Sequence, residues 1–268
     1  MMAKDKGFFL PHSIGLVATA LLCFSNPVSA TVVNVTIDGG DAIFLAGRTD
    51  LSIPPASDPW PGGMIRHSGP TPEEIVETLP PILSVSPGDV IRALDPAVGG
   101  ISFYNGFGPP LFGPDGGAGG ITDLSPFGGI SGFLSDGQGP LVGVFLDNSI
   151  PTSGAPARID FTAATGIGTD FLSVTPDLGQ VFFIGDGLTS TNVFQEFIAP
   201  TGATRLALGI PDGFGFVGAP GAYDDNDGAY RIRIGINEVP TIPEPATLAL
   251  MGLGLAGIGA ARCRKKSN

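Results

Sequence analysis

Ala229-Tyr230-Arg231-Ile232-Arg233-Ile234-Gly235-Ile236 is the stretch of this chain that most directly indicates its fold. Tyr230, Ile232, Ile234 and Ile236 fall on one side of an extended backbone, and the two arginines fall on the other. Strict alternation of apolar and polar residues is typical of a strand with one buried face. We therefore expect a half-buried β-strand over residues 229–236.

Upstream of this strand, short apolar runs recur between turn-forming residues. The chain has 42 Gly and 26 Pro among 268 residues, yet 43% of its residues are hydrophobic, which is enough apolar surface for a folded core. Many short strands with Gly/Pro turns predict an all-β fold, an antiparallel jelly roll or β-sandwich. The other predicted strands are 31–37, 42–45, 89–92, 101–104, 141–146, 157–161, 181–184, 193–198 and 204–208.

Two further segments interrupt this pattern. Thr71-Pro72-Glu73-Glu74 combines an N-cap, a proline at the first helical position and a capping-box glutamate, which predicts a short helix that ends at Pro80. Residues 105–140 are rich in Gly, Pro and Asp, and we expect a long loop there.

The body of the chain, residues 31–238, is strongly acidic. It contains seven arginines, no lysine and 23 acidic residues, a net charge of −16. Nucleic acid is excluded as a partner because phosphate binding needs a basic surface, whereas an acidic surface attracts divalent cations. The body has no cysteine and a single histidine, His67, so disulfides, thiolate metal sites and multi-histidine metal centres are excluded there.

An acidic loop directly precedes the final strand. It runs Pro220-Gly221-Ala222-Tyr223-Asp224-Asp225-Asn226-Asp227-Gly228-Ala229-Tyr230, with Asp212 a few residues upstream. Carboxylate, amide and backbone carbonyl oxygens are the ligands that Ca²⁺ prefers. The loop is not an EF-hand, since alignment on Gly228 puts Tyr223 and Ile234 at required ligand positions. The alternative is a solvated acidic turn, which Asp and Asn favour without any ion.

This loop resembles the C-terminal motif of calcium-dependent galactophilic bacterial lectins and of wider galactose-binding-like β-sandwiches. That motif is Pro-Gly-x-Tyr-x-Asn/Asp-Asn-x-Gly-x-aromatic followed by an alternating strand, and residues 220–230 match each fixed position. Residues 197–209, 87–91 and 141–146 also resemble strands of that family. The resemblance implies a bound Ca²⁺ with side-chain ligands from Asp212, Asp225 and Asn226 and backbone carbonyl ligands from Ala222 and Tyr104.

One departure from the lectin pattern concerns the sugar. In the lectins, a loop after the early strand supplies a histidine to the ligand, whereas here that loop is rich in Gly, Pro and Phe and has no histidine. Calcium binding without sugar binding and a calcium-dependent carbohydrate-binding lectin both remain open at this point.

The N-terminal segment, residues 1–30, has the pattern of a secretory signal peptide. Lys4 and Lys6 precede an apolar core over residues 14–24, and small residues follow it. We expect a signal helix, passage through the secretion translocon, and cleavage between Ala30 and Thr31.

The C-terminal segment, residues 239–268, joins three features in order. Pro243-Glu244-Pro245 is followed by sixteen uncharged residues, 246–261, which as a helix would span roughly 24 Å, short of the ~30 Å hydrocarbon core. Arg262, Arg264, Lys265 and Lys266 then form a basic end that stays in the cytoplasm. The alternative to a sorting signal is a permanent tail anchor.

This arrangement closely resembles the PEP-CTERM sorting signal of Gram-negative bacteria. The resemblance implies a transmembrane helix that holds the protein transiently in the inner membrane, followed by cleavage near Pro243-Glu244-Pro245 by an exosortase. It also implies release to the cell surface or the extracellular space, in association with biofilm and extracellular polysaccharide.

Three classes of function follow from these features. The favoured one is a non-catalytic, calcium-stabilised protein of the cell surface or extracellular matrix, and the second is the lectin. An enzyme acting on glycans is the least favoured, because His67 would have to serve any Ser/His/Asp chemistry and no spacing of the scattered acids singles out a catalytic pair.

Overall fold

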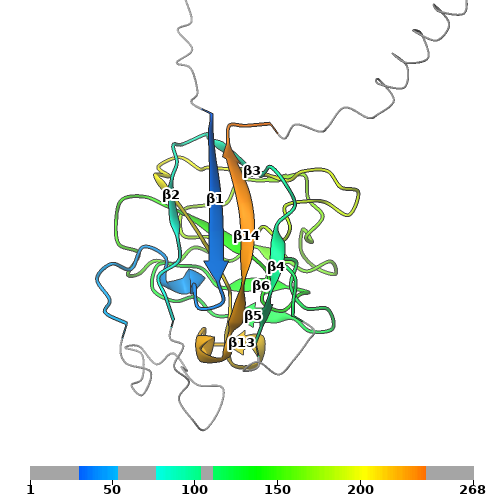
Figure 1. Ribbon diagram of the computed structural model, residues 1–268. Helices are drawn as coiled ribbons and strands as arrows, with labels where there is room; N and C mark the ends of the chain where they lie inside the picture. The colour runs from blue at the N-terminus through cyan, green and yellow to red at the C-terminus, as the bar shows by residue number, and fades with distance from the viewer. Residues whose placement is uncertain (1–29, 54–76, 104–110, 240–268) are drawn as a thin grey trace, which may run out of the picture.

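The computed structural model describes residues 30–53, 77–103 and 111–239, whose regular structure is almost all β-strand (Figure 1). The described helices are single 3₁₀ turns, η1 (Ile43–Leu45), η2 (Phe214–Phe216) and η3 (Tyr223–Asp225). The all-β prediction is confirmed. The strands are β1 (Thr31–Asp38), β2 (Ile82–Ser84), β3 (Val90–Ala93), β4 (Val98–Ser102), β5 (Thr122–Leu124), β6 (Phe133–Ser135), β7 (Val142–Leu146), β8 (Asp160–Phe161), β9 (Ser173–Val174), β10 (Val181–Phe183), β11 (Glu196–Ile198), β12 (Arg205–Gly209), β13 (Val217–Gly218) and β14 (Asp227–Ile236).

The largest sheet is built around β14. Tyr230, Ile232 and Ile234 are buried while Arg231 and Arg233 are exposed, so the predicted alternation is confirmed. β14 pairs along its full upper length with β1, as Figure 1 shows, and its other edge pairs with β4 and then β3. The strand order is β1-β14-β3-β11-β9, with β4 beside β14.

A second sheet, ordered β10-β7-β12-β2, supplies the centre of the core. β7 is buried at all five positions, which means that both of its faces are covered. Phe182 of β10 packs on Phe197 of β11, with ring centroids 5.3 Å apart, so the first two sheets meet through their apolar side chains. This contact is typical of a sandwich, while the jelly-roll order and the galactose-binding-like topology stay predictions.

A third sheet, β13-β5-β6-β8, corrects the prediction of a long loop over 105–140. β5 and β6 form an antiparallel pair inside that range. They are only three residues long, so their alternation is too short to be recognised in the sequence. The short pairs β13–β5, β6–β8 and β11–β9 are parallel, whereas the longer strands pair antiparallel as expected.

The predicted strand 42–45 is wrong. Its apolar residues are fully buried, but they form the 3₁₀ turn η1, in which Leu45 N–H donates to the Ala42 carbonyl at 2.9 Å. Burial against β7 and β12 explains the apolar run without a strand ladder. Predicted strand 193–198 begins only at Glu196, because Thr189 N–H donates to the Val193 carbonyl and closes a turn. Predicted strand 157–161 is likewise reduced to β8.

The pairing of β4 with β14 depends on glycine. Gly228 has φ +107°, and a Cβ placed on it would lie 2.2 Å from the Gly100 carbonyl oxygen. Gly99 has φ +112° and faces Ala229 in the same way. Side chains at these positions would push the two strands apart, since such φ values strain any residue with a Cβ.

The remaining predicted elements lie outside the described residues. These are the signal helix in 1–30, the helix that starts at Thr71, and the membrane helix over 246–261. Within 30–53, 77–103 and 111–239, no helix has the length and apolar character required to cross a membrane.

Candidate metal centre

The acidic loop connects β12 to β14 and folds back on itself. Gly213 forms a bridge with Pro220, and Gly221 N–H donates to the Asp212 carbonyl at 3.0 Å, which brings Asp212 beside the start of the turn over residues 221–226. Ala222 then adopts a left-handed conformation, with φ 61° and ψ 32°, and leads into η3. The loop therefore joins Asp212 to residues nine or more positions further along the chain.

Asp212 is a buried carboxylate with a defined set of donors. Its Oδ1 accepts from Gly213 N–H at 2.7 Å, and its Oδ2 accepts from Asn226 Nδ2 at 2.8 Å. Burial raises the pKa of Asp212 well above 3.8, against the effect of these two hydrogen bonds, and the nearby Asp225 and Asp224 carboxylates raise the pKa further. Negative charge at this position is unfavourable unless a cation accompanies it.

Asn226 links the loop to the turn after β1. Its Nδ2 donates to the Gly39 carbonyl at 3.0 Å as well as to Asp212. Its Oδ1 is buried and has no hydrogen-bond partner. An unpartnered buried amide oxygen is costly in a protein interior, so this oxygen is suited to a ligand that the protein alone does not supply.

Tyr223 supports the same loop from within. Its hydroxyl donates to the Ile210 carbonyl at 2.8 Å and accepts from Asp212 N–H at 3.3 Å. Burial, and then the charge of Asp212, raise the pKa of Tyr223 well above 10.0, so the hydroxyl stays protonated and keeps its role as donor. Tyr223 thus holds the backbone of Asp212 in place.

Most of the residues that the sequence predicts as calcium ligands lie close together in the structure. Asp212 and Asn226 are in direct contact, and Ala222 and Asp225 lie on the same turn as Asn226. Tyr104 lies outside the described residues. The alternative of a solvated turn does not fit residues 224–226, because Asp224, Asp225 and Asn226 are only 4%, 5% and 3% exposed.

Three contributors were missed by sequence reasoning. Tyr223 was recognised as a position of the motif, but not as the residue whose hydroxyl supports the backbone of Asp212. Gly39 accepts a hydrogen bond from Asn226 through its carbonyl. Glu77 is 1% exposed and lies close enough to raise the pKa of Tyr223. Gly39 and Glu77 come from distant parts of the chain. Only the Gly39-Gly40 pair gave any local signal, that of a turn.

The donor set bears on which ions could bind. Within the described residues, no group of three or more His, Cys, Asp or Glu side chains is arranged to hold a metal ion. A cation here would therefore depend on two carboxylates, one amide oxygen and backbone carbonyls. Such a mixed oxygen set fits Ca²⁺ and does not fit zinc or other ions that need nitrogen or sulfur ligands.

The C-terminal segment of the chain matches a known family of sorting signals. Residues 241–265 match the PEP-CTERM protein-sorting motif. The matched range contains Pro243, Glu244, Pro245 and the first three basic residues of the predicted tail, and Lys266 follows it directly. The motif indicates an exported, exosortase-processed protein with a C-terminal membrane-anchoring sorting signal.

No curated protein and no solved structure matched the chain in the corresponding searches. The resemblance of the body to calcium-dependent lectins therefore stays a prediction that rests on residues 220–230 and on the strands around them.

Proposed function

We propose that this chain is a non-catalytic protein of the cell surface or extracellular matrix, exported and released by an exosortase, whose β-sandwich is stabilised by one Ca²⁺. Asp212, Asp225 and Asn226 would hold the ion through side-chain oxygens, and Ala222 and Tyr104 through backbone carbonyls. The single observation that carries this proposal is the buried Oδ1 of Asn226, which has no partner among the described residues, while the Nδ2 of the same amide donates to the buried Asp212 carboxylate.

The ion would supply positive charge where the fold concentrates negative charge. It would offset the mutual repulsion of Asp212, Asp224 and Asp225, which raises the pKa of Asp212. Because Asn226 also contacts the turn after β1, the ion would tie that turn to the loop that precedes β14. Stiffening of this kind matters outside the cell, where no machinery repairs an unfolded chain.

The burial of the donors favours a structural ion over the lectin alternative. Asp212, Asp225 and Asn226 are 3%, 5% and 3% exposed. A sugar that binds through the ion would need the ion, and therefore its ligands, to be accessible from solvent. A glycan array probed with and without Ca²⁺ tests the lectin directly. Calcium-dependent binding to any glycan would overturn the structural assignment.

Processing at both ends is compatible with an intact sandwich. Thr31, the first residue after the predicted signal cleavage, pairs with Ile236, the last residue of β14. Thr31 and Ile236 therefore lie at the same end of the largest sheet (Figure 1), and neither cut would remove a residue of β1 or β14. Mass spectrometry of the secreted protein should find Thr31 at its N-terminus and no residues beyond Pro245, and a complete C-terminus would argue for a permanent anchor.

The test of the calcium site compares the thermal midpoint of the secreted protein in EDTA and in Ca²⁺. An ion that binds only the folded state at 100 times its dissociation constant adds about 2.7 kcal/mol. For a domain of this size, that corresponds to roughly 5–11 °C. Identical midpoints in EDTA and Ca²⁺ would remove the proposed site.

A further inference from the structure

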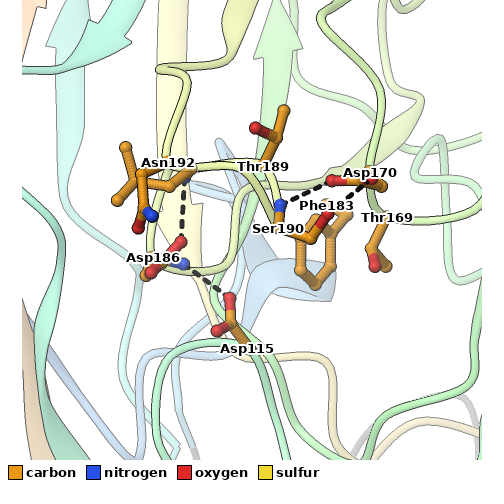
Figure 2. Close-up of a pocket in the computed structure, with 9 residues that line it drawn as sticks. Asp115, Thr169, Asp170, Phe183, Asp186, Thr189, Ser190 and Asn192 are labelled. Carbon is orange, nitrogen blue, oxygen red and sulfur yellow. Dashed lines mark hydrogen bonds between the residues drawn. The ribbon is translucent and has the colours of Figure 1, made fainter.

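A second feature, separate from the metal centre, is a polar recess of about 400 Å³. It lies between the segment after β10, which carries Asp186 and Ser190, and two other parts of the chain that carry Asp115 and Asp170. Figure 2 shows Asp115 beside Asp186 at one end and Asp170 beside Ser190 at the other. The volume falls within the range of small-molecule sites and holds many times the ~30 Å³ of one water molecule.

The walls of the recess are fixed by hydrogen bonds. Asp186 N–H donates to Asp115 Oδ1 at 2.8 Å, and Leu188 N–H donates to Asp186 Oδ1 at 2.8 Å. At the far end, Ser190 donates to Asp170 through its backbone N–H at 2.6 Å and its hydroxyl at 2.9 Å. The recess therefore has a defined shape before any ligand arrives, which lowers the entropy cost of binding.

Gln195 braces this arrangement from behind. Its side chain is fully buried, its Nε2 donates to the Thr169 carbonyl at 2.9 Å and the Phe171 carbonyl at 2.8 Å, and its backbone N–H donates to the Gly187 carbonyl at 2.9 Å. These bonds connect the wall that contains Thr169 to the wall that contains Asp186 and Leu188. Gln195 thus holds both sides of the recess together, one through its side-chain amide and the other through its backbone N–H.

Two carboxylates retain free oxygens in the recess. Asp115 and Asp186 each use Oδ1 to cap a backbone N–H, and among the described residues Oδ2 of each has no hydrogen-bond partner. The pKa of Asp115 is raised mainly by desolvation, and repulsion by the Asp186 carboxylate raises it further. Among the described residues that line the recess there is no Lys, Arg or His, so a cation would be favoured there.

The rest of the lining indicates an organic cation. In the described part of the chain, no three acidic or His/Cys side chains are grouped to ligate a metal, which argues against a bare ion as the occupant. Thr169 Oγ1 and the Asn192 amide have no partner among the described residues and can bond hydroxyl groups, while Phe183 and Leu188 add apolar surface to the lining. A ligand of matching chemistry carries a positive charge, several hydroxyls and a C–H surface.

We propose that this recess binds a sugar unit bearing a protonated primary amine. The amine lies between Asp115 and Asp186, and the ring hydroxyls bond Thr169 and Asn192. Charge-assisted hydrogen bonds from the amine to the two free Oδ2 atoms provide the selectivity over neutral sugars. The ligand needs no Ca²⁺, because the recess shares no residue with the metal centre.

Titration of the secreted protein with glucosamine, glucose and N-acetylglucosamine, all in EDTA, tests this proposal by NMR. We expect glucosamine to shift the amide signals of Asp186, Leu188 and Ser190 and to bind at least tenfold more tightly than the two uncharged sugars. Equal affinity for glucosamine and glucose, or no shift at these amides, would overturn the proposal. Because EDTA removes Ca²⁺, the outcome does not depend on the proposed metal centre.

Matched variants separate the two carboxylates from general charge effects. Asp115→Asn and Asp186→Asn keep the Oδ1 acceptor and remove the charge, and each should weaken glucosamine binding by at least fivefold. Asp177→Asn is the control, because it removes the same charge from an exposed side chain that accepts no hydrogen bond in the described structure, and its affinity should stay within twofold. Unchanged glucosamine affinity in both recess variants would overturn the assignment of Asp115 and Asp186 as ligands of the amine. If a variant does not fold, the amide shifts of the wild-type protein still test whether glucosamine binds in the recess.

Discussion

Replacing Asn226 with alanine is the sharpest test of the candidate metal centre, because a matched control exists elsewhere in the chain. Asn226 and Gln195 are the two described side chains with a buried polar atom that lacks a partner. Each donates two hydrogen bonds through its amide nitrogen and leaves its amide oxygen unpaired. Of these two amides, the Asn226 amide donates to a buried carboxylate, that of Asp212, whereas the Gln195 amide donates to backbone carbonyls. The two variants should therefore lose similar hydrogen bonds but differ in their response to Ca²⁺.

The expected magnitude follows from the bonds that are lost. Asn226→Ala removes one bond to a neutral carbonyl, worth about 1 kcal/mol, and one to the Asp212 carboxylate, worth about 1.5–3 kcal/mol. In EDTA we expect a loss of roughly 2.5–4 kcal/mol, or about 5–16 °C in Tm. Gln195→Ala removes two bonds to neutral carbonyls and should cost about 2–3 kcal/mol.

Calcium then separates the two variants. Wild-type protein at 100 times its dissociation constant should gain about 2.7 kcal/mol, and Gln195→Ala should gain the same. If the loss of the Asn226 oxygen weakens Ca²⁺ binding about 100-fold, the gain at the same Ca²⁺ concentration falls to about 0.4 kcal/mol. Urea unfolding in EDTA and in Ca²⁺ measures all three differences. An undiminished calcium gain in Asn226→Ala would refute the assignment of Asn226 as a ligand.

Three further predictions concern the surrounding structure. Tyr223→Phe should lose about 1–2 kcal/mol of stability through its bonds to Ile210 and Asp212 while keeping the calcium gain, as urea unfolding would show. Burial raises the pKa of Asp212, so in EDTA its ionisation destabilises the folded state increasingly as the pH rises above 3.8. Asp212→Asn should therefore gain stability relative to wild type between pH 4.5 and 8, and a constant difference across that range would contradict a raised pKa. Gly228→Ala should lower the free energy of unfolding by at least ~2 kcal/mol, because its Cβ would lie 2.2 Å from the Gly100 carbonyl oxygen. Gly154, with φ +77° and open space around it, is the control, and Gly154→Ala should cost about 1 kcal/mol. Thermal unfolding of both variants measures the difference.

Much of the fold could be predicted because alternation along a strand is a local property. Residues 230–234 alternate in sequence and in burial, and the predicted strands at 31–37 and 204–208 are found within one residue of their ends. The segment 42–45 failed, since a buried apolar run has the same composition in a strand and in a 3₁₀ turn. β5 and β6 were missed because three residues cannot display a period.

The candidate metal centre, like the fold, could be predicted in part from local sequence. The motif over residues 220–230 located Asp212, Ala222, Asp225 and Asn226, but a solvated acidic turn has the same sequence. Burial decides between the two, and the turn at Gly39, which contacts Asn226, reaches the site from more than 130 residues away in the chain. No local pattern contains that information.

By itself, the sequence determined the properties that need only neighbouring residues. The alternating strand, the acidic and cysteine-free body, and the sorting motif at 241–265 are of this kind, because each is read from a continuous segment. Tertiary structure alone decided which distant groups meet. Asp115, Asp170 and Asp186 carry no shared sequence signal, and they line one recess only because chain segments far apart in sequence pack side by side around Gln195.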